Sequence, residues 1–421
     1  MKYGNRALFL VISLCGGSLF LACGSGGGNG GPAAGTGGSA SAGTGGRTGA
    51  SGGSTGANSG GSSGASNGGS TGASSGGSTG AGGSGMSGAG GAPTNRDAST
   101  DGTTVVDAGS EARPADATPG AALKIVEWMI PRAAAFPHDP AVDGKGVSWW
   151  VDSDNSYIGR WDPATGATMD WATPTPNCYP HGINPDDQDQ LWYTGNRCGR
   201  LGKVNPANGM ITEYPVMASD PHSLVFHKGA IWFTAQNAAR YGRLNPADGT
   251  AQVWPAPAGS RPYGLWPAPD GTIWIALFGT NKIGQVDPAS PTTLREVTLP
   301  NGGTRPRRIA VDTAGHVYYT DYARGFLGRF DPAANAHKEW RSPAGAGSQP
   351  YGITVGPDKR IYYCESGADS IAVFDPASER FESIAIPTKG SVVRNMTTDF
   401  ARRRVWLALS GVRRMAYIDV P

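Results

Sequence analysis

The sequence predicts an all-β fold, a seven-bladed β-propeller of four-stranded blades, and the first observation behind this is a repeat. A short step, usually Pro followed by His or Tyr, recurs at intervals of 43, 41, 41, 44, 44 and 43 residues. Its copies are Pro137-His138, Pro180-His181, Pro221-His222, Pro262-Tyr263, Pro306-Arg307, Pro350-Tyr351 and, in degenerate form, Val393-Arg394. Four strands in about 40–45 residues is the spacing of a propeller blade, which helical solenoid repeats do not fit.

The second observation is the composition of each repeat. Short runs rich in Val, Ile, Trp, Tyr and Thr, such as residues 273–276, alternate with turns rich in Gly, Pro, Asn and Asp. Such runs are typical of half-buried strands. In turns such as Asp162-Pro163, the Asp side chain caps the turn and Pro presets φ, so we give these residues a structural role.

The third observation is the way the two ends of the repeat region complement each other. The last repeat stops at Pro421 after three strands, and residues 124–130 resemble the fourth strands of the other repeats. We therefore expect strand 124–130 to complete the last blade, which leaves only short, protected sheet edges.

The N-terminal part has a different composition. Residues 1–23 combine basic Lys2 and Arg6 with a short apolar core, as in a signal peptide, and the segment ending in Cys23 resembles a bacterial lipobox with Phe20 where Leu is usual. An ordinary signal peptide with an incidental Cys is the alternative. Residues 24–119 are rich in Gly, Ser and Ala and predict a disordered linker. The sequence thus predicts an exported propeller, residues 120–421, lipid-anchored to the membrane of the cell envelope through Cys23 and facing the periplasm or the exterior.

The formal charge is +2 over 421 residues, which indicates neither a nucleic-acid partner nor charge-driven membrane binding. We expect a monomer whose partner is a small molecule or a surface ligand. Cys178 and Cys198 fall in loops that open on one face of the same blade, so we predict a disulfide between them. Metal binding by this pair is the weaker alternative because no CxxC spacing is present. Cys364 is left as a small buried hydrophobe.

Two positions in each blade are expected to form rings around one mouth of the central channel. The residue after the repeat Pro gives His138, His181, His222, Tyr263, Arg307, Tyr351 and Arg394. The residue fourteen positions later gives Asp152, Gly195, Gln236, Leu277, Asp321, Glu365 and Ala408. Core packing would select small or apolar residues at these positions, so the titratable groups predict a ligand site at the mouth.

At these residues the chain resembles the virginiamycin B lyase (streptogramin lyase) family, whose blades read P-[HY]-G-I, W-F-T-E and N-x-I-G-R. Matching segments are Pro180-His181-Gly182-Ile183, Pro350-Tyr351-Gly352-Ile353, Trp232-Phe233-Thr234 and Ile158-Gly159-Arg160, and the resemblance covers residues 123–421. It implies a seven-bladed propeller and a Mg²⁺-dependent carbon–oxygen lyase that opens a cyclic depsipeptide by β-elimination.

The resemblance also implies roles for the two rings. The family's histidine positions correspond to His138, His181 and His222, as catalytic residues, and its metal-binding acid positions to Asp152, Asp321 and Glu365. The other ring residues, Arg307, Arg394, Tyr263, Tyr351 and Gln236, would then bind the substrate.

The chain departs from the family pattern at several of these positions. Only the first blade combines a His with an acid, His138 with Asp152, and two blades carry Arg where the family often has His or a small residue. A non-catalytic, surface-tethered propeller that binds a carbohydrate, peptide or protein is therefore the alternative. A calcium-dependent lactonase of six blades fits poorly, because seven repeats are present. A fold alone does not fix a function.

Overall fold

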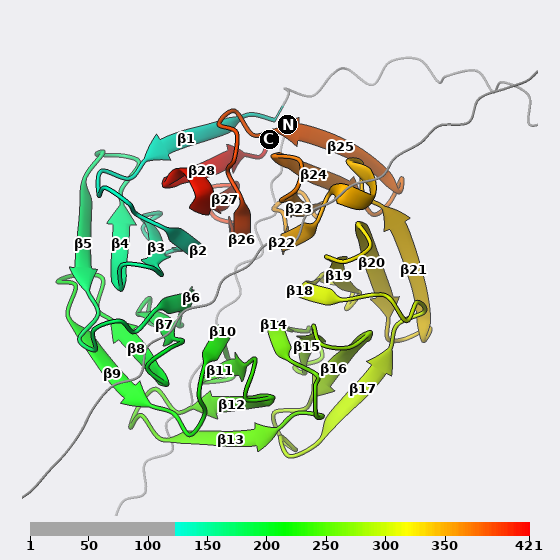
Figure 1. Ribbon diagram of the computed structural model, residues 1–421, viewed down its shortest axis with the longest axis horizontal. Coiled ribbons are helices and arrows are strands. Elements are labelled where there is room, and N and C mark those ends of the chain that lie inside the picture. The colour runs from blue at the N-terminus through cyan, green and yellow to red at the C-terminus, as the bar shows by residue number, and fades with distance from the viewer. Residues whose placement is uncertain (1–122) are drawn as a thin grey trace, which may run out of the picture. The chain divides into compact units, whose positions relative to one another are not determined.

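The computed structural model describes residues 123–421. Seven four-stranded antiparallel sheets are arranged as a ring of blades around a central channel (Figure 1). The predictions for the export segment, for Cys23 and for the linker as far as residue 119 lie outside the described residues. No helix in the described part of the chain is long and apolar enough to cross a membrane.

Each blade uses four strands, named a to d from the channel outward. Blades 1 to 3 consist of β2 (Pro137–Val142), β3 (Ser148–Asp152), β4 (Tyr157–Trp161), β5 (Thr168–Ala172); β6 (Pro180–Pro185), β7 (Leu191–Gly195), β8 (Arg200–Val204), β9 (Ile211–Pro215); β10 (Pro221–His227), β11 (Ala230–Ala235), β12 (Arg240–Leu244) and β13 (Ala251–Pro255). Blades 4 and 5 consist of β14 (Pro262–Pro267), β15 (Ile273–Leu277), β16 (Lys282–Val286), β17 (Leu294–Thr298); β18 (Pro306–Val311), β19 (Val317–Asp321), β20 (Phe326–Asp331) and β21 (Ala336–Arg341). Blades 6 and 7 consist of β22 (Pro350–Val355), β23 (Ile361–Glu365), β24 (Ser370–Asp375), β25 (Arg380–Ala385); β26 (Val393–Asp399), β27 (Arg404–Leu409), β28 (Arg414–Asp419) and β1 (Ile125–Met129). Two short 3₁₀ turns, Gly345–Gly347 and Ser410–Val412, lie in loops.

The core lies between neighbouring blades. The b strands are central in their sheets, and in β3, β7, β15, β19 and β23 every residue is buried. Both faces of such a strand contact an adjacent blade, which explains their continuous apolar and aromatic composition. The d strands form the outer edge of the ring, and nearly all of their residues are exposed or half-buried.

The last blade is closed by the N-terminal strand, as predicted. Strand β1 pairs with β28 from Ile125 opposite Ile418 to Met129 opposite Arg414. The closure is reinforced by Glu127, whose carboxylate accepts hydrogen bonds from the backbone amide and the hydroxyl of Thr388.

A β-bulge at the start of every a strand shapes the channel mouth. In blade 2, for example, Pro180 pairs with Gly195 and the next pair is Ile183 with Tyr193, so one extra residue lies on strand a. The same shift occurs in all seven blades. Because a bulge re-aims the side chains beside it, the residue after the repeat Pro turns out of the sheet and into the mouth.

Beside each bulge, backbone amide and carbonyl groups lose their partners in the sheet, and threonines of the b strands form hydrogen bonds with some of these groups. The hydroxyl of Thr194 accepts a hydrogen bond from the amide of Gly182 at 2.8 Å and donates to the carbonyl of His222 in the next blade at 2.8 Å. Thr234 and Thr320 link blades 3 to 4 and 5 to 6 in the same way. In blade 6 this position is Cys364, so its thiol is more than a small hydrophobe: it donates to the carbonyl of Val393.

Candidate functional site at the channel mouth

All seven residues of the first predicted ring line one cavity of about 310 Å³ at the mouth of the channel. The strand-a bulges bring them together, one from each blade. The complete lining consists of His138, Tyr179, His181, Asn196, His222, Gln236, Asn237, Arg261, Tyr263, Phe278, Arg307, Tyr351 and Arg394.

Three histidines form one side of this cavity. The ring centroids of His138 and His181 lie 3.8 Å apart, those of His181 and His222 3.8 Å, and that of Tyr263 continues the row 3.9 Å from His222. The three imidazoles are 3–6% exposed. The Nδ1 atom of His181 is buried and has no hydrogen-bond partner among the described residues, so it is available to a ligand or a water molecule.

The environment keeps these imidazoles neutral. Burial lowers the pKa of His138 well below its ordinary value of 6.5, and the positive charges of Arg394, Arg308 and Arg307 lower it further. Burial and the neighbouring ring also lower the pKa values of His181 and His222 well below 6.5. At neutral pH each ring therefore offers one donor and one acceptor nitrogen.

The other side of the cavity contains an arginine held among aromatic rings. The guanidinium carbon of Arg307 lies 3.7 Å from the ring centroid of Tyr351, 4.2 Å from that of Tyr322 and 5.2 Å from that of Tyr263. The hydroxyls of Tyr263 and Tyr351 are hydrogen-bonded to each other. Stacking of this kind fixes the plane of a guanidinium. Nη2 of Arg307 donates a long hydrogen bond of 3.4 Å to the hydroxyl of Tyr263, and its other N–H groups make no hydrogen bond to the described residues.

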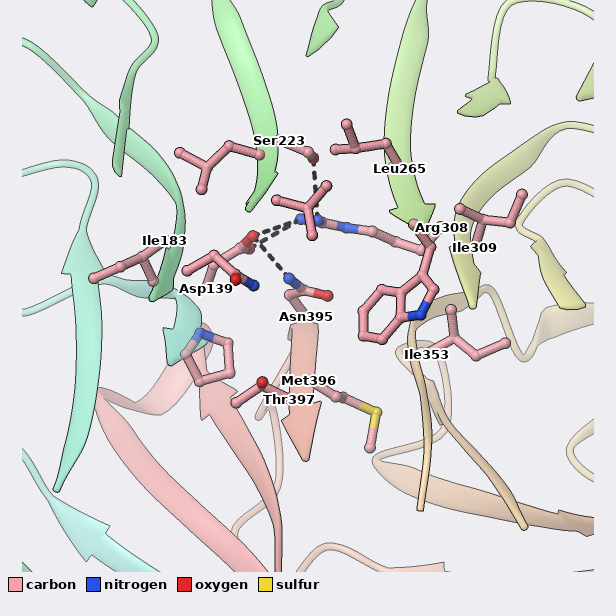
Figure 2. Close-up of a pocket in the computed structure, with 16 residues that line it drawn as sticks. Asp139, Ile183, Ser223, Leu265, Arg308, Ile309, Ile353, Asn395, Met396 and Thr397 are labelled. Carbon is pink, nitrogen blue, oxygen red and sulfur yellow. Dashed lines mark hydrogen bonds and ion pairs between the residues drawn. The ribbon is translucent and has the colours of Figure 1, made fainter. Parts of the chain in front are cut away.

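The cavity floor is a buried polar network that no sequence pattern predicted. Asp139 accepts two hydrogen bonds from Nη2 of Arg308, at 2.9 and 3.1 Å, and one from Nδ2 of Asn395 at 2.8 Å (Figure 2). Arg308 also donates to the hydroxyl of Ser223, and Asp139 lies 2.8 Å from Nδ1 of His138. The network joins blades 1, 3, 5 and 7 across the axis.

A signal for this floor exists in the repeat. The residue two positions after the repeat Pro is polar in blades 1, 3, 5 and 7 and glycine in the other three blades, Gly182, Gly264 and Gly352. A Cβ on Gly352 would lie 2.8 Å from the backbone of Asn395, and one on Gly264 2.9 Å from that of Arg308. The glycines leave room for the polar side chains of the alternate blades to meet.

The three predicted metal-binding acids do not line the cavity. Asp152 accepts hydrogen bonds from the amide of Phe136 and from Asn155, and Asp321 accepts from the amide of Arg305 and pairs with Arg324. Burial raises the pKa of both aspartates. Likewise, Glu365 accepts from the amide of Ala344 and the hydroxyl of Ser370. Each acid thus holds the loop that enters its own blade, and its role as a metal ligand stays a prediction.

The donor set at the mouth does not fit Mg²⁺, which prefers carboxylate, carbonyl and water oxygens. No carboxylate is among the described lining residues. One group of described residues has three possible metal-ligand atoms within 4.8 Å of one another, and it joins the lining residues His138 and His181 to Asp139 of the floor. Both oxygens of Asp139, however, are already occupied by Arg308 and Asn395, so a metal ion would have to break a buried ion pair.

The remaining predicted residues lie near the mouth. Gln236 lines the cavity, although the residue opposite the repeat Pro in blade 3 is Ala235. Cys178 and Cys198 form the predicted disulfide, with their Cα atoms 4.7 Å apart, in the loops of blade 2. This bond holds together the loops that carry the lining residues Tyr179 and Asn196.

Comparison with known proteins agrees with this geometry. Residues 225–420 match the model of the Virginiamycin B lyase family. No curated protein sequence matches the chain.

Three solved propellers illustrate the structural similarity. Virginiamycin B lyase from Staphylococcus aureus is 21% identical, covers 71% of this chain and 100% of its own, and superposes with a TM-score of 0.66. A catalytically inactive histidine-to-alanine variant of that enzyme with quinupristin gives 20% identity, the same coverage and a TM-score of 0.66. The WD40 β-propeller domain of Doa1 is 11% identical, covers 69% of this chain and 95% of its own, and has a TM-score of 0.57.

These identities are below 25%, so the solved structures establish the fold alone. The family model adds sequence evidence from blade 3 to the end of the chain. Residues 225–420 therefore match the model of the virginiamycin B lyase family, within a seven-bladed propeller that has the fold of that family's solved members.

Proposed function

We propose that the channel mouth is the active site of a carbon–oxygen lyase that opens a small cyclic ester or depsipeptide by β-elimination. The observation that carries this proposal is the row of three neutral imidazoles in one cavity, facing two arginines. The virginiamycin B lyase of S. aureus supports it, because a catalytically inactive variant of that enzyme lacks a histidine.

His138 has the environment of a general base. Asp139 accepts a hydrogen bond from its Nδ1, which places the proton on that nitrogen and leaves the lone pair on Nε2. A buried aspartate that fixes the tautomer and orientation of a histidine is the arrangement found in catalytic triads. Arg308 and Asn395 hold Asp139 in place, so the pair is rigid.

The reaction would proceed without added water. Nε2 of His138 takes the proton from the carbon between a carbonyl and the ester-bearing carbon, a carbon–carbon double bond forms, and the C–O bond breaks to release a carboxylate. Negative charge that develops on the neighbouring carbonyl oxygen would be stabilised by the N–H edge of Arg307 or Arg394, a role for prearranged donors in a site partly shielded from water.

The test is to incubate the purified full chain with a streptogramin B and to follow the linear product by mass spectrometry, with and without EDTA. We expect turnover that EDTA does not abolish, and its loss in His138→Gln. The control is His316→Gln, which removes a histidine hydrogen-bonded to Asp312 and outside the cavity lining. No turnover of streptogramins or simpler cyclic esters would refute the proposal.

A second candidate function is ligand binding without catalysis. It is favoured by one observation: Asp152, Asp321 and Glu365 are engaged with their own loops, so the mouth lacks the acids that the family resemblance implies. Saturable binding of an ester that is recovered unchanged would support this candidate over the lyase.

A further inference from the structure

Two arginines at the mouth have no acidic partner among the described residues. Arg307 and Arg394 both line the cavity, yet neither forms an ion pair within residues 123–421. The Nε atoms of both are buried and make no hydrogen bond, as is also true of Arg308, and the one hydrogen bond of Arg307 within the described residues is the 3.4 Å contact of its Nη2 with the hydroxyl of Tyr263. The next residue in the chain, Arg308, shows the contrast, because it is paired with Asp139. Buried or half-buried charges are normally paired, so these two guanidinium groups point to a missing anion.

The surroundings supply no negative charge to take that place. The described lining has no Asp or Glu, and a further arginine, Arg261, lies at the rim. Asp139 is neutralised by Arg308, and Asp154, whose charge reaches Tyr179, is exposed and outside the lining. The cavity at the mouth is therefore positively charged, and such a cavity raises the local concentration of anions.

The geometry of Arg307 narrows the class of anion. Its guanidinium group lies over Tyr351, with Tyr322 and Tyr263 around it, and its only hydrogen bond to the described residues is the long one of 3.4 Å to the Tyr263 hydroxyl, so it can still form two parallel hydrogen bonds with an anion. Planar bidentate pairing is the favoured geometry between arginine and a carboxylate. The aromatic groups beside it, among them Phe278, offer an apolar surface for the body of a small organic molecule.

We propose that the mouth binds a small organic carboxylate, with Arg307 and Arg394 on the carboxylate and the tyrosine and phenylalanine rings on the attached carbon body. This inference names a ligand class for the site of the proposed function and rests on the mouth being that site, but it does not require turnover. In the lyase reaction the broken ester releases a carboxylate, so the product would carry the group that this site binds.

The test uses isothermal titration calorimetry on the full chain with benzoate and its neutral isostere benzamide. We expect benzoate to bind at least about ten-fold more tightly than benzamide, as expected for a charge-assisted hydrogen bond. Arg307→Gln and Arg394→Gln should each weaken benzoate binding by about ten-fold or more and leave benzamide binding unchanged. The matched control is Arg295→Gln, an exposed arginine on β17 that bonds Gln285 away from the mouth.

Several results would overturn the inference. These are equal affinity for benzoate and benzamide, unchanged benzoate binding in both mouth variants, or inorganic phosphate binding more tightly than benzoate. Thermal unfolding of each variant confirms that the fold is retained. If benzoate binds as expected but no ester is opened, the lyase proposal fails and the carboxylate site stands. If an ester is opened but benzoate does not bind, the lyase proposal stands and the carboxylate site fails.

Discussion

The row of histidines makes the stability of the propeller depend on pH. The pKa values of His138, His181 and His222 are lowered well below 6.5, chiefly by burial. In the unfolded chain each ring takes up a proton near pH 6.5, whereas in the folded protein it stays neutral. Acidification therefore favours unfolding, and the stability that is complete above pH 6.5 falls as the pH decreases below it.

The magnitude follows from the linkage relation. Between pH 6.5 and 5.5, a ring that is protonated only in the unfolded chain costs about 1 kcal/mol of stability, so the row costs about 3 kcal/mol in all. Partly exposed His337, whose pKa is also lowered by burial, adds a smaller change of the same sign. Buried Asp152 and Asp321 have raised pKa values and act in the opposite direction, but their ordinary value of 3.8 places most of that change below this window.

The measurement is guanidinium-induced unfolding of the full chain at pH 8.0, 7.5, 6.5 and 5.5, followed by the fluorescence of its 12 tryptophans. We expect equal free energies of unfolding at pH 8.0 and 7.5, and a fall of about 3 kcal/mol between pH 6.5 and 5.5. His222→Gln should remove about one third of that fall. A free energy of unfolding that is flat to pH 5.5 would show that the rings are protonated in the folded protein as well. A slope that His222→Gln leaves intact would show that His222 does not contribute to it, and either result would refute the reasoning.

Two further predictions concern the stability of the ring. The Cys178→Ala, Cys198→Ala double variant should lose about 3 kcal/mol of its free energy of unfolding, because the disulfide closes a loop with a sequence separation of 20 residues. A reductant should lower the denaturation midpoint of the wild type but not that of the double variant. An equal effect of the reductant on both proteins would contradict this prediction. Trp128→Ala should cost about 2–3 kcal/mol in thermal or chemical unfolding, because this half-buried residue of β1 stacks on Trp161 at 4.8 Å. Val126→Ala, at a 40% exposed position of the same strand, should cost less than about 0.5 kcal/mol, and similar losses in the two variants would disprove the role of the stack.

The fold was predictable because the spacing of the repeat indicates both the number of strands in a blade and the number of blades. Each blade is one unit of four strands, and its turn residues recur at nearly constant intervals, so the blade count and the closing strand follow from the sequence. The positions of the first ring were also predictable, since they are counted from the repeat Pro and the bulge that turns them lies at that residue. The second ring was less predictable, because a fixed offset ignores local differences in strand a. The residue of strand b that pairs with the first residue of strand a is Ala235 in blade 3 and Leu409 in blade 7, whereas the fixed offset predicts Gln236 and Ala408.

The use of a polar side chain could not be predicted from its position in the repeat. Asp152 and His138 lie at neighbouring positions of one blade, and the sequence gives both a place near the mouth. In the structure the imidazole lies in the cavity, while the carboxylate accepts from the amide of Phe136 in the entering loop. A buried backbone amide without a hydrogen-bond partner is energetically costly. The backbone geometry therefore decides whether a polar side chain pairs with a loop amide or lies in the cavity.

The polar floor has a consequence for how any ligand reaches the site. Arg308 extends from blade 5 to Asp139 in blade 1 and, with Asn395 and Ser223, lines a cavity of about 30 Å³ in the channel (Figure 2). That space is enough for one or two water molecules. Because the Arg308–Asp139 pair spans the channel at this level, we expect a ligand to enter and leave by the mouth. The same network that closes the channel also orients His138 through Asp139, so the barrier and the proposed base depend on one buried ion pair. Breaking that pair would open the channel and misplace the histidine together, because a buried charge without its partner is too costly to remain in place.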